Sequence, residues 1–218
     1  MHEMILFSAT VFMGLFAIMN PFANTPIFIG LTQSVDSKQK KLIAFNSLLY
    51  AFIIVAAFCV LGHFIFSLFG ITLPAFKITG GILLFLVGYN LIQGKETPVH
   101  HPSDERKQEI REKFENNETN IAISPLAIPI LAGPGTISTA MNFVGASPDF
   151  SHILIVIIAF ALLCLITYLM FISGERLIRI LGPGLLNVIT RIMGLILAVI
   201  ATQMVIGGIH GAREMYGQ

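Results

Sequence analysis

The sequence predicts an all-α, polytopic membrane protein whose six transmembrane helices form two inverted three-helix repeats. The first observation is composition, because apolar residues make up 55% of the 218 residues and charged residues only 11%, and the mean hydropathy is +0.83. The second is that several apolar stretches are long enough to cross a hydrocarbon core of about 30 Å as helices. These stretches are residues 4–30, 42–69, 72–92, 121–144, 153–172 and 186–206. The third is a pair of matching interruptions.

The first and fourth stretches are each interrupted near the middle. Residues 20–26 (NPFANTP) place two prolines and three polar side chains in the first stretch, and residues 133–139 (GPGTIST) interrupt the fourth. Proline removes a backbone donor and clashes with the carbonyl four residues before it. Because unsatisfied backbone groups cannot face lipid, we expect both breaks to lie near the bilayer midplane, buried against protein or lining a wet cavity.

The two breaks belong to an internal repeat. Sequence offsets of 112 to 114 bring proline, glycine, hydroxyl and basic positions of the two halves into register. The aligned pairs include Pro21 and Pro134, Thr25 and Ser138, Gly70 and Gly182, and Lys77 and Arg191. We therefore predict repeats at residues 1–94 and 121–218, joined by a charged linker at 95–120. Three spans in each repeat give the two repeats opposite polarity, an architecture found mainly in transporters.

The placement of Lys and Arg predicts the orientation. These residues are confined to the connection at 32–41, the linker at 95–120, the connection at 173–185, positions 77 and 191 inside two stretches, and the carboxyl end of the chain. Cytoplasmic loops carry the excess of basic residues, so all three connections are predicted to be cytoplasmic and both termini to lie outside. No basic residue precedes the first stretch, which we expect to be a permanent span rather than a cleaved signal peptide.

The breaks carry the residues that we expect to bind a ligand. A helix that restarts inside the membrane directs free N–H groups at a carboxylate, and a helix that stops there presents carbonyls to an ammonium group or a cation. A small zwitterionic substrate therefore fits without any charged side chain. The predicted substrate-binding residues are Asn20, Pro21, Asn24, Thr25, Gly133, Pro134, Gly135, Thr136, Ser138 and Thr139. The alternative is that both breaks are structural kinks, since proline is common in membrane helices.

Ionisable residues inside the stretches are few. No Asp or Glu lies within any of them, which argues against a proton relay built on a buried carboxylate. A coupling cation, Na⁺ or H⁺, would have to use backbone oxygens or His63. Lys77 and Arg191 either extend to the lipid headgroups or form a gate or a carboxylate contact. We find no enzyme, cofactor or metal-ligand motif and no basic face for nucleic acid, and a homo-oligomer is possible.

The motifs resemble those of the MarC family of bacterial inner-membrane proteins over essentially the whole chain. The similarity lies in Asn20-Pro21 with Asn24 and Pro26, in residues 125–129 (PLAIP) and 132–138 (AGPGTIS), and in residues 192–194 (IMG). It implies a six-span protein of the bacterial or archaeal cytoplasmic membrane, related to small neutral amino acid transporters of the SnatA type. This chain has Ala23 where the family usually has Gly. It also has Lys77 where the family usually has Arg, and a lysine at that position cannot bind a carboxylate through two parallel hydrogen bonds as arginine does.

The sequence thus predicts a secondary transporter of glycine-like and alanine-like amino acids, working by alternating access, and no enzyme. Two other classes stay open. One is a channel or lipid-handling protein in which the breaks form a continuous path, and saturable, stereoselective exchange distinguishes a carrier from it. The other is a membrane partner without transport activity that acts through residues 95–120, and deletion within that linker would abolish its effect.

Overall fold

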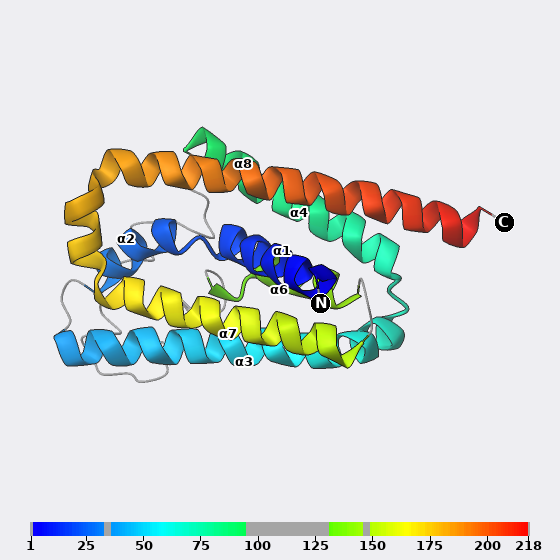
Figure 1. Cartoon of the computed structure of the whole chain (residues 1–218), viewed down its shortest axis with the longest axis horizontal. Helices are drawn as coiled ribbons and strands as arrows, with labels where there is room; N and C mark the ends of the chain where they lie inside the picture. Colours follow the sequence, from blue (N-terminus) through cyan, green and yellow to red (C-terminus); the bar gives the residue numbers. More distant parts are fainter. Residues whose placement is uncertain (1, 33–35, 95–130, 146–148, 218) are drawn as a thin grey trace.

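The computed structural model describes residues 2–32, 36–94, 131–145 and 149–217 (Figure 1). The regular elements in these ranges are all helices, which confirms the all-α prediction. They are α1 (His2–Met19), α2 (Pro21–Leu31), α3 (Ser37–Phe69), α4 (Leu73–Gln93), α6 (Pro134–Gly145), α7 (Phe150–Ile172) and α8 (Gly174–Tyr216).

Five segments of the described residues are long and apolar enough to cross a membrane. They are Glu3–Leu31, Ser37–Gly62, Leu73–Gln93, Phe150–Ile172 and Gly184–Tyr216. These segments confirm a polytopic membrane protein. The predicted stretch at 121–144 begins outside the described residues, and its second half is α6, so a sixth crossing stays a prediction. The predicted linker at 95–120 also lies outside the described residues.

The ends of α3 and α4 follow directly from local sequence. Asp36 caps α3, with its side chain accepting a 2.7 Å hydrogen bond from the Gln39 amide. The helix ends at Gly70, whose φ of 63° favours glycine. Thr72 then caps α4, and Pro74 lies in its first turn, where the missing amide proton has no helical partner to lose. The second and third predicted stretches are therefore joined by a very tight turn.

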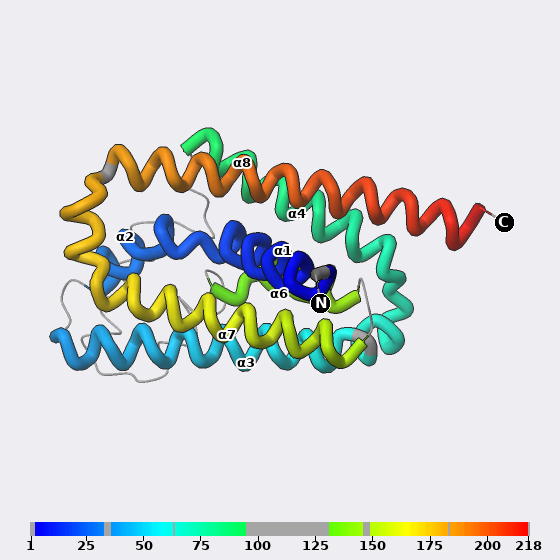
Figure 2. The backbone as a smooth tube through the Cα atoms, viewed as in Figure 1, coloured from blue at the N-terminus to red at the C-terminus, as the bar shows by residue number. Residues whose placement is uncertain are grey.

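Helices α4 and α8 run antiparallel along one side of the bundle, and α8 reaches that side by turning sharply at Gly182 (φ 69°, ψ 160°) (Figure 2). Their backbones touch through glycines. A Cβ atom on Gly81 would lie 2.7 Å from the Ala201 carbonyl oxygen, and one on Gly88 equally close to the Gly194 carbonyl oxygen. Small residues give membrane helices this close approach.

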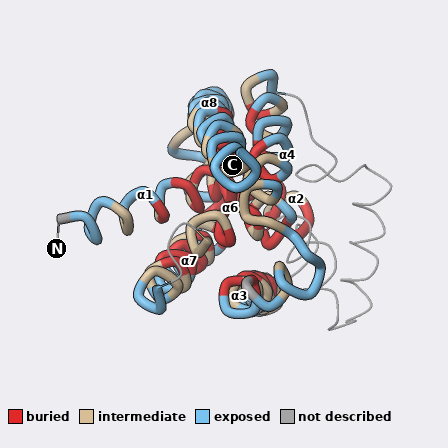
Figure 3. Tube along the Cα trace, turned by 90° about the vertical axis from the view of Figure 1, so that its right-hand side faces the viewer, coloured by how far each residue is buried: buried red, intermediate tan, exposed pale blue. Residues whose placement is uncertain are grey.

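Helix α6 lies near the centre of the bundle in the end-on view, and the outer helices turn their exposed residues away from it (Figure 3). Large apolar side chains cover the outer faces, including Phe45, Val60, Phe64, Leu162, Leu169 and Val199. An apolar surface of this extent suits contact with lipid rather than water. Because the outer faces are apolar like the core, the few buried polar residues are the candidates for a binding site inside the bundle.

Candidate functional site

The first predicted break contains a change of helix at a single residue. Asn20 separates α1 from α2 and has φ 40° and ψ 69°, the only positive φ at a non-glycine residue in the described part of the chain. Asparagine adopts this left-handed conformation more readily than most residues. Its backbone N–H donates to the Phe16 carbonyl at 2.9 Å, and its Oδ1 accepts from the Ala23 amide at 3.3 Å. Asn20 therefore both ends α1 and caps α2.

Two further polar side chains close hydrogen bonds around this break. Asn24 Nδ2 donates to the carbonyl oxygen of Met19, the last residue of α1, and Thr25 Oγ1 donates to the Pro21 carbonyl at 2.7 Å. Both side chains are buried. Asn20 Nδ2 and Asn24 Oδ1 are also buried, but neither forms a hydrogen bond with the described residues. Among the described residues, the break thus holds one donor and one acceptor without a hydrogen-bond partner, which is uncommon in a buried site.

The second predicted break begins α6 and is built mainly from backbone. Pro134 is the first residue of the helix and is exposed. The Ile137 amide donates to the Gly133 carbonyl at 3.1 Å, and Thr139 Oγ1 donates to the Gly135 carbonyl at 2.9 Å. The polar side chains buried at this end of α6 are Thr136, Ser138 and Thr139. An apolar bundle therefore encloses three hydroxyl groups directly after a helix start.

The two breaks adjoin through α1. A Cβ atom on Gly135 would lie 3.0 Å from Ile18 Cδ1, and Ile18 precedes Asn20 by two residues. One turn further along α6, a Cβ atom on Gly80 of α4 would lie 3.1 Å from Ser138 Cβ. The start of α6 is thus held between the end of α1 and the middle of α4. Glycine at both contact positions gives the space for this approach.

Lys77 and Arg191 lie at opposite ends of the α4 and α8 pair. Arg191 is exposed, and its Nη2 lies 3.1 Å from where a Cβ atom on Gly94 would stand, at the carboxyl end of α4. A positive charge there is favourable with the helix dipole. Lys77 is half-buried and lies one turn before Gly80, which contacts α6. Within the described residues, neither side chain forms a hydrogen bond or ion pair with the two breaks, so their role as a gate or carboxylate contact stays a prediction.

Thr167 on α7 belongs to the surroundings of the first break, although its sequence context does not reveal it. It is fully buried, and its Oγ1 lies 3.6 Å from Met19 Sδ while donating to the Leu163 carbonyl at 2.8 Å. Threonine often bonds back to its own helix in this way, so no pattern separates this residue from a structural one. Within the described residues, no group of three His, Cys, Asp or Glu side chains is placed to hold a metal ion.

The sequence matches a known protein family along nearly its whole length. A family model described as "MarC family integral membrane protein" matches residues 5–213. The chain belongs to this family. The UPF0056 membrane protein YvbG of Bacillus subtilis (strain 168) is 40% identical over 208 residues, covering 95% of this chain and 96% of that protein. The resemblance inferred from the break motifs is confirmed.

Other MarC family relatives come from distant organisms. The UPF0056 membrane protein MJ1677 of Methanocaldococcus jannaschii is 41% identical over 201 residues, which are 92% of this chain and 95% of that protein. YhcE of Escherichia coli (strain K12), a UPF0056 membrane protein, is 34% identical over 92% of this chain and 90% of its own. No solved structure matches the chain significantly. These names describe membrane proteins and assign no substrate.

Proposed function

We propose that this MarC family protein is a secondary transporter of small neutral amino acids such as glycine and alanine. The observation that carries the proposal is the pair of unpartnered amide atoms at the first break, Asn20 Nδ2 and Asn24 Oδ1. Leaving a buried donor or acceptor unpaired costs roughly 1–3 kcal/mol. A ligand that brings both an acceptor and a donor, as a zwitterionic amino acid does, relieves both costs.

The second break supplies a place for the substrate carboxylate. The first hydrogen bond of α6 starts at the Ile137 amide, so the amides of Gly135 and Thr136 precede it and are available to an anion. The ammonium group then binds near Asn24 Oδ1 and the carbonyls at the end of α1. Because glycines line this region, the site favours a substrate with a small side group.

Alternating access requires two similar halves, and several features support the inverted repeat. Asp36 and Asp149, 113 positions apart, both precede helices in extended conformation. Gly70 and Gly182, 112 apart, both have positive φ, 63° and 69°. Helix α2 packs on α7 and α8 in the way that α6 packs on α3 and α4. On this basis we propose two repeats of three spans, with the first and fourth spans broken near the bilayer midplane.

The remaining features of the proposal concern sidedness and coupling. The basic connections and the linker at 95–120 face the cytoplasm in the inner membrane, and both termini lie outside. A coupling cation, Na⁺ or H⁺, would bind carbonyl oxygens at the breaks, since the six predicted apolar stretches contain no Asp or Glu. Homo-oligomerisation is compatible with this arrangement. We propose no enzymatic activity.

Counterflow in proteoliposomes tests the function. Purified protein is reconstituted with unlabelled L-alanine inside, and uptake of labelled L-alanine, D-alanine and glycine is measured. We expect saturable, stereoselective exchange. Flux that neither saturates nor discriminates between enantiomers would instead indicate a pore. Absence of exchange for every small amino acid, from a preparation shown to be folded, would reject the transporter.

A further inference from the structure

Among the described residues, cavities lie between the helices toward both ends of the bundle, and two of these cavities differ in size. The larger, about 670 Å³, lies where α3, α4, α6 and α7 meet, and its lining includes Phe58, Met141 and Ile153. The smaller, about 250 Å³, lies between α2, α3, α7 and the start of α8, and its lining includes Phe28, Lys40 and Phe171.

These two cavities occupy equivalent places in the proposed repeat. An offset of 113 residues relates Phe58 to Phe171, Phe28 to Met141 and Lys40 to Ile153. The same stretches of each half therefore line both cavities. In an inverted repeat such cavities lie on opposite sides of the membrane, so their difference in size indicates that the space between the helices is wider toward one side. A further cavity of about 560 Å³, at the same end of the bundle as the smaller one, lies mainly on the outer face of α3, where Leu42 and Phe45 are exposed, and not in the space between the two halves.

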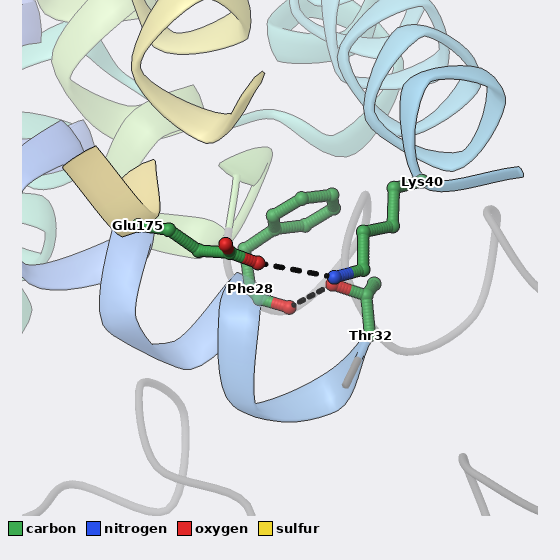
Figure 4. A network of polar contacts seen from close by, with 4 residues as sticks. All are labelled: Phe28, Thr32, Lys40 and Glu175. Carbon is green, nitrogen blue, oxygen red and sulfur yellow. Dashed lines mark hydrogen bonds and ion pairs between the residues drawn. The ribbon is translucent and has the colours of Figure 1, made fainter. Parts of the chain in front are cut away.

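Two contacts narrow the smaller cavity, and Figure 4 shows one of them, the ion pair between Lys40 and Glu175. The rings of Phe28 and Phe171 stack with centroids 4.4 Å apart and planes 4° from parallel, which joins α2 to α7. Lys40 Nζ lies 3.3 Å from Glu175 Oε1, which joins the start of α3 to the start of α8. Next to the ion pair, Thr32 Oγ1 donates to the Phe28 carbonyl at 2.8 Å and closes the last turn of α2.

The larger cavity lacks the equivalents of these two contacts. Met141 stands in the position of Phe28, so no pair of rings forms with Phe58, and Ile153 stands in the position of Lys40, so no ion pair forms. The larger cavity extends to Met141, one helical turn beyond Ser138 in the candidate site. The open end thus leads toward the second break, and the closed end is held by contacts that only its own residues make.

We propose that the Phe28–Phe171 stack and the Lys40–Glu175 ion pair form a gate that closes the basic, cytoplasmic end of the substrate pathway. In the state described, this gate is shut and the opposite end is open. The inference rests on the proposed alternating-access function and names the groups that govern access to that site. Opening the gate separates α2 and α3 from α7 and α8, and the equivalent surfaces of the other half then come together.

Paired cysteine reporters test the gate. Leu31 and Val144 are equivalent at an offset of 113, and Leu31 is buried beside the smaller cavity whereas Val144 is half-buried and lines the larger one. Leu31→Cys and Val144→Cys are introduced singly into a background in which Cys59 and Cys164, both buried, are replaced by alanine. A membrane-impermeant thiol reagent is then applied to either side of oriented vesicles. We expect labelling of the Val144→Cys protein from outside and little labelling of the Leu31→Cys protein from inside.

Weakening the gate should reverse this pattern. Glu175→Gln removes the ion pair without changing side-chain size, so labelling at position 31 should rise about two- to fivefold, the effect of a partly exposed ion pair, while labelling at position 144 falls. Lys40→Glu should act similarly, and Lys40→Glu combined with Glu175→Lys should restore the original labelling rates.

Phe171→Leu removes the ring stack and should have a larger effect on labelling than the ion-pair variants. Lys38→Met is the matched control, because Lys38 does not line the smaller cavity.

Labelling rates unchanged by Glu175→Gln, the charge exchange and Phe171→Leu would overturn the gate, even if the same proteins exchange alanine. Reciprocal changes at positions 31 and 144, without exchange of any small amino acid, would support the gate and reject the transported substrate. A parallel rise at both positions indicates general loosening of the fold and also overturns the gate. Labelling does not depend on transport, so the two proposals fail separately.

Discussion

The two predicted breaks reach a similar place in the bundle by different chemistry. At the first, Asn20 and Asn24 supply amide side chains that cap α2 and bind the end of α1. At the second, Gly133, Pro134 and Gly135 supply no polar side chain. The polar groups there are the backbone at the start of α6 and the hydroxyl groups that follow it, those of Thr136, Ser138 and Thr139. We therefore expect substitutions at the first break to act mainly through lost side-chain hydrogen bonds. At the second break, we expect them to act mainly through lost space and displaced backbone.

The largest effect is expected from Asn24→Leu. This change keeps approximate volume but removes the hydrogen bond to the buried Met19 carbonyl, and leaving that group unpaired costs roughly 1–3 kcal/mol. It also removes the proposed ammonium contact. We expect exchange to fall about 10- to 100-fold while the protein still inserts in the membrane, measured by counterflow and membrane extraction. Thr10→Val is the control, because Thr10 bonds only to its own helix at Leu6 and is exposed. Normal exchange by Asn24→Leu protein would favour the structural-kink interpretation.

A pair of substitutions at Thr136 separates space from side-chain chemistry at the second break. Thr136 is 2% exposed. Thr136→Val keeps the shape of the side chain and removes its hydroxyl group. If the backbone amides bind the substrate, this variant should retain exchange within about threefold of the unmodified protein. The amides are unchanged, and a neutral hydrogen bond contributes only about 1 kcal/mol. Thr136→Leu adds bulk to a filled site and should lower exchange about tenfold. Equal loss in both variants would assign the binding role to the hydroxyl group instead.

The contact between the breaks can be tested by a compensating pair. Gly135→Ala places a methyl group 3.0 Å from Ile18 Cδ1, which is too close without a shift. We expect a loss of about 1 kcal/mol in stability, seen as a lower thermal midpoint in detergent. Ile18→Val removes that Cδ1 atom, so the double variant should recover most of the loss. Additive effects of the two changes would show that they do not touch in the protein.

Local features of this fold were predictable from sequence. Gly70 and Pro74 mark their turn by fixed backbone preferences, and Asn20-Pro21 marks the change of helix, because each signal depends on neighbouring residues only. The glycine contacts between α4 and α8 were also predictable, since small residues are the main means of close packing in membrane helices.

Long-range pairings were not predictable in the same way. Lys40 and Glu175 are 135 positions apart, and Thr167 reaches Met19 from a helix with apolar residues on both faces. In a soluble helix the polar face shows which side packs inward, but here Leu162 faces outward and Leu163 inward with equal hydrophobicity. Hydropathy alone therefore does not show which side chains surround the breaks.

The smallest effect is expected at Ala23, where the family resemblance suggests glycine. Ala23 is half-buried in the first turn of α2, and its amide donates to Asn20 Oδ1. Ala23→Gly keeps that hydrogen bond but increases backbone freedom, so stability should fall by about 0.5–1 kcal/mol at most. Removing the methyl group also widens the first break. We therefore expect exchange of serine or threonine to increase relative to glycine, measured by competition in counterflow, with Ala17→Gly as a control in the body of α1. An unchanged substrate preference would show that the Ala23 methyl group lies outside the space that the substrate occupies, and would limit the first break to the groups of Asn20 and Asn24.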